Sequence, residues 1–158
     1  MLAVLALLAA AIAPFLERGK GTVEDVSGRA SVIDGDSLTV AGREVRLHGI
    51  DAPEGRQTCR RDGRDWACGD AARDRLASLI RGRDVVCEGV EIDRHGRLLA
   101  VCRVTGIDIG REMVVSGLAL AYGRYGSEEA DAKSRRNGLW GAEFQKPRDW
   151  REERGIGG

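Results

Sequence analysis

The sequence predicts a single α+β domain that is mainly β, with five short strands forming a Greek-key barrel and about three helices. Five short β-prone runs are separated by turn signals. The 158 residues leave room for one domain with its own core and little for a second. Twenty-two glycines and 32% charged residues suit a turn-rich β fold better than a helical bundle.

The first three strands are expected as a meander. Two β-prone runs, residues 30–33 and 37–40, flank the turn signal Asp34-Gly35. Another turn follows, and residues 44–50 alternate enough in polarity to form a third strand. The first third of the domain is therefore a three-stranded unit.

The middle of the chain contains a loop, a helix and two strands. Residues 55–69 are rich in glycine and charge, which predicts a loop. Residues 70–81 have apolar side chains at helical spacing, so we expect an amphipathic helix capped by Asp70. Residues 85–87 and 98–104 are the fourth and fifth strands.

The last third predicts two further helices and a tail. Residues 109–116 suit a short helix, and 127–136 form a helix whose acidic start and basic end complement its dipole. Residues 118–122 fit either a helix or a strand. We expect the domain to span residues 27–145 and residues 146–158 to be a charged, flexible tail. Together the strands suggest a barrel of the oligonucleotide-binding (OB) type.

The start of the chain is apolar. Residues 1–16 carry no charge and are mostly Ala and Leu, and Ala11-Ile12-Ala13 offers a small-residue cleavage site. We therefore expect a signal peptide or an N-terminal membrane anchor, followed by a linker over residues 17–26. The protein would then be periplasmic, secreted or tethered to a membrane. A buried first helix is the alternative.

The four cysteines suit the same oxidising compartment. Sequence alone allows three pairings, and four buried thiols are the alternative if the chain is not exported. A hairpin turning at Arg94-His95 would set two cysteines opposite each other, and the other two would close a local loop. The preferred pairing is Cys87–Cys102 with Cys59–Cys68.

The overall charge does not recruit nucleic acid. Lys+Arg and Asp+Glu number 25 each, so the formal net charge is zero. Binding of a polyanion must therefore depend on local arginines and a metal ion.

Acidic and basic residues occur in an order that suits phosphodiester hydrolysis. Carboxylates can hold a hard metal ion and handle a water, and guanidinium groups can bind a phosphate. The ordered set is Asp36, Arg46, Asp51, Glu54 and Arg97. We assign Asp34 to a turn, and Pro53 restricts the backbone between two of the acids.

Most of the chain, from about Ser27 to Trp140, resembles the staphylococcal nuclease (thermonuclease) family. The matching motifs are Val32-Ile33-Asp34-Gly35-Asp36, Arg46-Leu47, Ile50-Asp51-Ala52-Pro53-Glu54, Asp93 with Gly96-Arg97, and Gly138-Leu139-Trp140. They match in order and in local spacing. The resemblance implies an OB-fold barrel, calcium as cofactor and cleavage of nucleic acid.

The resemblance also implies roles for individual residues. Calcium would be held by the Asp36 and Asp51 side chains and by the Ala52 carbonyl. Glu54 would orient or deprotonate the attacking water. Arg46 and Arg97 would bind the phosphate and spread positive charge over the five-coordinate phosphorus.

Contacts to the nucleotide are expected to differ from the family pattern. Arg94 and His95 stand where the family usually carries a lysine and a tyrosine, and His95 stacks less extensively on a base. Tyr122 matches a tyrosine of the nucleotide pocket, whereas Arg124 stands where a second aromatic is expected. We expect Arg94, His95 and Tyr122 to bind substrate.

Three interpretations follow. The first is an exported or membrane-tethered, monomeric Ca²⁺-dependent nuclease that cleaves DNA, RNA or both by in-line attack of water, leaving 3′-phosphate ends by analogy with the family. The alternative is a non-catalytic OB-fold module that binds nucleic acid or protein. The third is a structural exported domain whose charged residues form surface pairs. A binding module has no need to keep the whole catalytic set together, which favours the nuclease.

Overall fold

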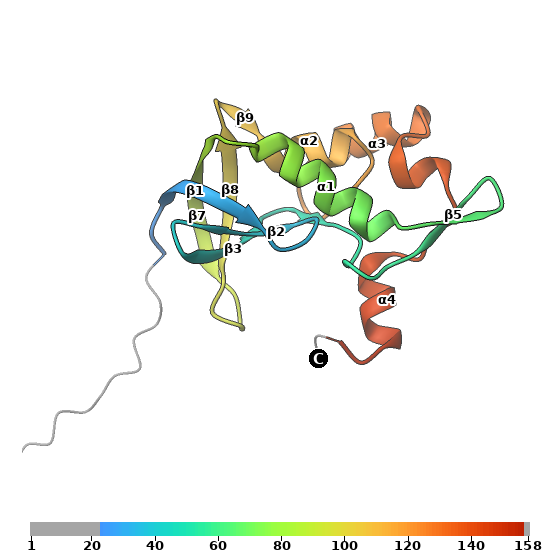
Figure 1. Cartoon of the computed structure of the whole chain (residues 1–158), viewed down its shortest axis with the longest axis horizontal. Helices are drawn as coiled ribbons and strands as arrows, with labels where there is room; N and C mark the ends of the chain where they lie inside the picture. The colour runs from blue at the N-terminus through green and yellow to red at the C-terminus, as the bar shows by residue number, and fades with distance from the viewer. Residues whose placement is uncertain (1–22, 157–158) are drawn as a thin grey trace, which may run out of the picture.

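The computed structural model describes residues 23–156, in which a closed, mixed five-stranded barrel is combined with four α-helices (Figure 1). This arrangement is consistent with an OB fold and confirms the predicted fold class. The expected leader at residues 1–16, and residues 17–22 of the expected linker, lie outside the described residues.

The barrel closes through one parallel pair of strands. Four antiparallel pairs join β3 to β2, β2 to β1, β1 to β7 and β7 to β8, and the parallel pairing of β3 with β8 completes the ring. The barrel strands are β1 (Val26–Val32), β2 (Ser37–Val40), β3 (Arg43–Leu47), β7 (Asp84–Ile92) and β8 (Leu98–Val104). All five lie at or close to the predicted runs, and β9 (Ile107–Asp108) extends the sheet beside β8.

The barrel interior is filled by the inward faces of these strands. Val45 of β3 stands opposite Leu98 of β8, and both side chains are fully buried. Leu38 and Val40 of β2 and Val85 of β7 join the same core. Burial of these aliphatic side chains is the main source of the barrel's stability.

Four α-helices and one 3-10 helix surround the barrel within the described residues. They are α1 (Cys68–Ile80), α2 (Ile109–Val115), α3 (Gly126–Ser134), α4 (Pro147–Glu153) and the 3-10 helix η1 (Gly138–Gly141). The first three confirm the predicted helices. Asp70 lies in the first turn of α1 but is not its cap, because the helix begins two residues earlier, after Ala67.

Two short paired segments lie outside the barrel. β4 (Ile50–Asp51) pairs with β10 (Leu120–Ala121), so part of the region left open between helix and strand is a strand. β5 (Cys59–Arg61) and β6 (Arg64–Trp66) form a hairpin where we expected only a loop.

The C-terminal segment differs from the expected flexible tail. Residues 147–153 form α4, in which Pro147 occupies the start and Trp150 is only 9% exposed. Figure 1 shows α4 and the loop between β7 and β8 extending from one side of the barrel, while α1, α2 and α3 lie along the other. The expectation of a tail is therefore wrong for this helix.

Two disulfides, Cys59–Cys68 and Cys87–Cys102, confirm the predicted pairing. Disulfides of this kind are typical of proteins that fold in an oxidising compartment. No helix within residues 23–156 combines the length and apolar character needed to span a bilayer.

Candidate active site

The turn between β1 and β2 places the first acidic residue beneath the surface. The backbone N–H of Asp36 donates to Asp34 Oδ1 at 3.0 Å, which confirms Asp34 as a turn residue. Gly35 lies so close to the rest of the fold that an added Cβ would meet the Cβ atoms of Ala72 and Ala52 at 2.7 and 2.8 Å. Only glycine at this position allows the turn to pack against Ala52 and Ala72.

Asp36 is 3% exposed, and each of its carboxylate oxygens accepts a hydrogen bond. Arg46 Nη1 lies 2.9 Å from Oδ1, and the Ala52 N–H donates to Oδ2 at 2.8 Å. Burial raises the pKa of Asp36 from 3.8 to about 7, although Arg46 acts in the opposite direction. The ionised carboxylate is therefore costly here unless further positive charge is near.

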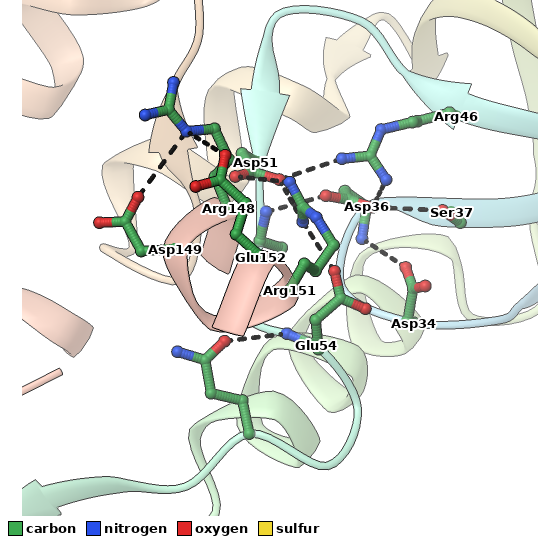
Figure 2. Close-up of polar contacts among 12 residues, drawn as sticks. Asp34, Asp36, Ser37, Arg46, Asp51, Glu54, Arg148, Asp149, Arg151 and Glu152 are labelled. Carbon is green, nitrogen blue, oxygen red and sulfur yellow. Dashed lines mark hydrogen bonds and ion pairs between the residues drawn. The ribbon is translucent and has the colours of Figure 1, made fainter. Parts of the chain in front are cut away.

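Arg46 joins the two predicted metal-binding carboxylates. It lies on β3, and its second terminal nitrogen donates to Asp51 Oδ1 at 3.0 Å. Asp51 ends the short strand β4, so the pairing of β4 with β10 determines where this carboxylate lies. Figure 2 shows the Arg46 guanidinium joined by dashed lines to both Asp36 and Asp51.

Glu54 lies on a turn held by a buried glutamine. Gln57 is 1% exposed, its Oε1 accepts from the Glu54 N–H at 3.2 Å, and its Nε2 donates to the Gln145 carbonyl at 2.6 Å. The Gln57 N–H closes the turn by donating to the Glu54 carbonyl at 2.7 Å. The turn that carries Glu54 is thus tied to the segment that leads into α4.

Arg151 of α4 completes the cluster, and sequence reasoning missed it. Its Nη1 lies 2.9 Å from Asp51 Oδ1 and 2.7 Å from Glu54 Oε1. Burial lowers the pKa of the Arg151 guanidinium, but its hydrogen bonds to Asp51 and Glu54 outweigh this and raise the pKa overall. Figure 2 shows the side chain reaching from α4 toward both acids.

Arg97 lies on the loop between β7 and β8 and lines the same cavity as Glu54 and Arg46. Its Nε donates to Asp93 Oδ2 at 2.8 Å, and its backbone N–H donates to Asp93 Oδ1 at 2.9 Å. The cavity has a volume of about 710 Å³. Its lining includes six cationic or histidine side chains: Arg46, Arg94, His95, Arg97, Arg148 and Arg151.

The three residues expected to bind substrate are divided between two cavities. Arg94 and His95 are exposed at the rim of the 710 Å³ cavity, where Arg94 Nε lies 3.1 Å from His95 Nε2. Tyr122 is 72% exposed and lines a neighbouring cavity of about 600 Å³ instead. Arg46 and Arg151 line both cavities.

Several of these residues, Arg46, Asp51, Glu54 and Arg97 among them, lie in a region that matches a known family. The sequence profile described as "Staphylococcal nuclease homologue" matches residues 44–142. This chain belongs to the staphylococcal nuclease family. Asp36 and the helix α4 lie outside the matched residues of this family member.

Several relatives of this nuclease-family chain carry functional names. It is 39% identical over 131 residues to the succinoglycan biosynthesis protein ExoI of Rhizobium meliloti (strain 1021), covering 78% of this chain and 69% of that protein. It is 34% identical over 142 residues to a micrococcal nuclease of Shigella flexneri, covering 76% of each. An uncharacterized endonuclease of Escherichia coli is 31% identical over 143 residues, covering 82% and 88% respectively.

The acidic residues of this nuclease-family site suit a hard cation. Within residues 23–156 no group of three or more His, Cys, Asp or Glu side chains forms a metal-binding cluster. Two carboxylates are nevertheless close together, because Asp36 and Asp51 share Arg46, and Asp36 also accepts from the N–H of Ala52, the residue whose carbonyl is the third expected ligand. Calcium takes such oxygens and completes its six to eight ligands with water and substrate. The chemistry of these oxygens fits calcium.

Proposed function

We propose that this protein is an exported or membrane-tethered, monomeric, calcium-dependent nuclease that hydrolyses phosphodiester bonds of DNA, RNA or both and leaves 3′-phosphate ends. One observation supports this most. Asp36, Arg46, Asp51 and Glu54 form one contact network through guanidinium groups, and Arg97 faces the same cavity as Arg46 and Glu54. The nuclease names of the relatives and the two disulfides agree with it.

Each residue has a part in this mechanism. Asp36, Asp51 and the Ala52 carbonyl would hold calcium, which supplies positive charge opposite the phosphate. Arg46 and Arg97 bind the phosphate oxygens and offset the charge that develops on them. Glu54 orients the attacking water and accepts its proton. Arg94, His95 and Tyr122 contact the rest of the nucleotide.

Cleavage of a fluorogenic single-stranded DNA in calcium, and then in chelator, tests the proposal. We expect chelator to abolish cleavage. Glu54→Gln and Arg97→Ala should each lower kcat by about 10²–10³-fold, because each removes a group that acts on the transition state. The matched controls are Glu88→Gln and Arg135→Ala, whose exposed partners lie outside the cavity.

The outcome separates the nuclease from the alternative module. A binding module would retain nucleic acid in the same assay without cutting it, with or without calcium. Cleavage that survives chelator, or that is unaffected by both site variants, would contradict the mechanism. Mass spectrometry of the cleaved ends checks the 3′-phosphate, since 3′-hydroxyl products would require the opposite P–O bond to break.

A further inference from the structure

Arg151 contacts two of the predicted catalytic acids, although it lies about 100 residues after them in the sequence. Its guanidinium bridges Asp51 and Glu54 through Nη1, and Nη2 lies 3.3 Å from Asp51 Oδ2. The side chain is 22% exposed, and those of Asp51 and Glu54 are 14% and 24% exposed. These contacts are therefore screened less by water than a surface ion pair.

The helix that carries Arg151 is anchored independently of this ion pair. Pro147 and Trp150 of α4 are buried, and Arg154 lies over the Trp150 ring at 4.3 Å. Just before the helix, Gln145 accepts from the buried Gln57. The guanidinium thus projects from a helix that has buried residues of its own besides the ion pairs with the acids.

Arg151 differs from its neighbour on the same helix. Arg148 lies 3.7 Å from Asp149 and 3.3 Å from Glu152, both on α4 itself. Figure 2 shows Arg148 beside these helix acids and Arg151 directed at the candidate site. Asp51 therefore interacts with two guanidinium groups, Arg46 from the barrel and Arg151 from α4.

We infer that Arg151 is a positioning residue for Glu54 and Asp51, and that its positive charge competes with calcium for Asp51. The inference rests on the proposed function. An arginine fork can hold two carboxylates in a fixed relation, which a single ammonium group cannot do equally well. A like charge beside a cation site weakens cation binding. Arg151 therefore improves turnover and weakens calcium affinity.

These two effects have opposite signs, which a merely structural role would not produce. In Arg151→Gln we expect calcium to bind about five- to tenfold tighter by isothermal titration calorimetry, the size expected for deleting one like charge. The kcat of the same variant should fall about 10–100-fold, as for loss of an outer-shell partner. Unfolding of the helix would instead weaken both properties.

A conservative variant separates charge from geometry. Arg151→Lys keeps the charge and loses the fork, so calcium affinity should stay within about twofold of the wild type while kcat falls by less than in Arg151→Gln. Arg135→Gln is the matched control, because it removes an exposed arginine that pairs with Asp131 on α3, outside the cavity. It should bind calcium and cleave like the wild type.

Clear results would overturn the inference. It fails if Arg151→Gln binds calcium no tighter than the wild type, or if it cleaves at the wild-type rate. It also fails if Arg151→Lys restores full turnover, since charge alone would then suffice. A wild-type protein that neither binds calcium nor cleaves would defeat the proposed function itself, and the two failures are thereby distinguished.

Discussion

At the scale of single residues, Asp93 determines how Arg97 is held. Its carboxylate accepts from the Arg97 N–H, the Arg97 Nε and the His95 N–H. Burial raises the pKa of Asp93, but these hydrogen bonds outweigh it, so the pKa lies below the ordinary 3.8. The ionised form of Asp93 is thus favoured by folding.

Asp93→Asn should therefore reduce stability most at neutral pH. A depressed pKa in the folded state contributes stability that is present above about pH 4 and is lost as pH falls through the folded value. The difference in unfolding free energy between wild type and Asp93→Asn should be constant from about pH 7 to 5 and shrink toward about pH 3. Urea denaturation at these pH values measures it, and a gap that widens in acid would contradict the assignment.

The sequence identified four residues that the structure brings together in the candidate site, but it did not identify Arg151. The order Asp36, Arg46, Asp51, Glu54 is visible in the sequence because these residues lie on adjacent strands and turns. Arg151 is not, because its contact with Asp51 spans 100 residues. The residues around Arg151 in the sequence do not indicate that this arginine, among many others, contacts a distant acid.

At the scale of elements, α1 and the turn that carries Glu54 are in direct contact. Gly69, in the first turn of α1, lies against the Glu54 carbonyl, which leaves no room for a Cβ. The Gly69 N–H also donates to the Gln57 carbonyl at 3.1 Å. The first turn of α1 therefore determines how close the Glu54 turn lies to the helix.

Gly69→Ala should move this turn. We expect the unfolding free energy to fall by about 1–3 kcal/mol, the usual cost of overpacking, and kcat to fall because Glu54 is displaced. Gly126→Ala at the start of α3 is the matched control, because a Cβ there meets nothing within 4 Å. Denaturation and cleavage assays report both effects. Wild-type turnover in Gly69→Ala would show that the turn tolerates the shift.

Element prediction succeeded where apolar periodicity was strong. The β5–β6 hairpin has the Asp62-Gly63 turn signal, with positive φ at both residues, but its strands are mostly charged. Helix α4 has signals too, with Pro147 at its start, Asp149 in the first turn and Arg151 in the last. Only two of its residues are buried, so the pattern of an amphipathic helix is absent.

At the scale of the whole molecule, two disulfides connect the site to its surroundings. Cys87–Cys102 joins β7 to β8 and closes the segment that includes Asp93 and Arg97. Cys59–Cys68 joins the β5–β6 hairpin to the start of α1. The Arg97 loop and the segment between the Glu54 turn and α1 are thus each next to a covalent link.

Removal of Cys87–Cys102, the disulfide that closes the longer loop, should destabilise the protein measurably. The Cys87→Ala, Cys102→Ala double variant opens a loop with a sequence separation of 15, so we expect a loss of about 3 kcal/mol in the chain-entropy model. Urea denaturation of this variant beside the oxidised wild type measures the loss. The wild type treated with reductant should shift in the same direction. Equal stability of variant and oxidised wild type would contradict the expectation.

The long separation between Asp51 and Arg151 bears on how the protein is made. The ribosome adds about 5–20 residues per second and makes the last barrel strand, which ends at Val104, before α4, which begins at Pro147. All five barrel strands are therefore present in the chain before Arg151 is added to it. Because we infer that Arg151 positions Glu54, we expect full activity only after α4 has packed against the acids.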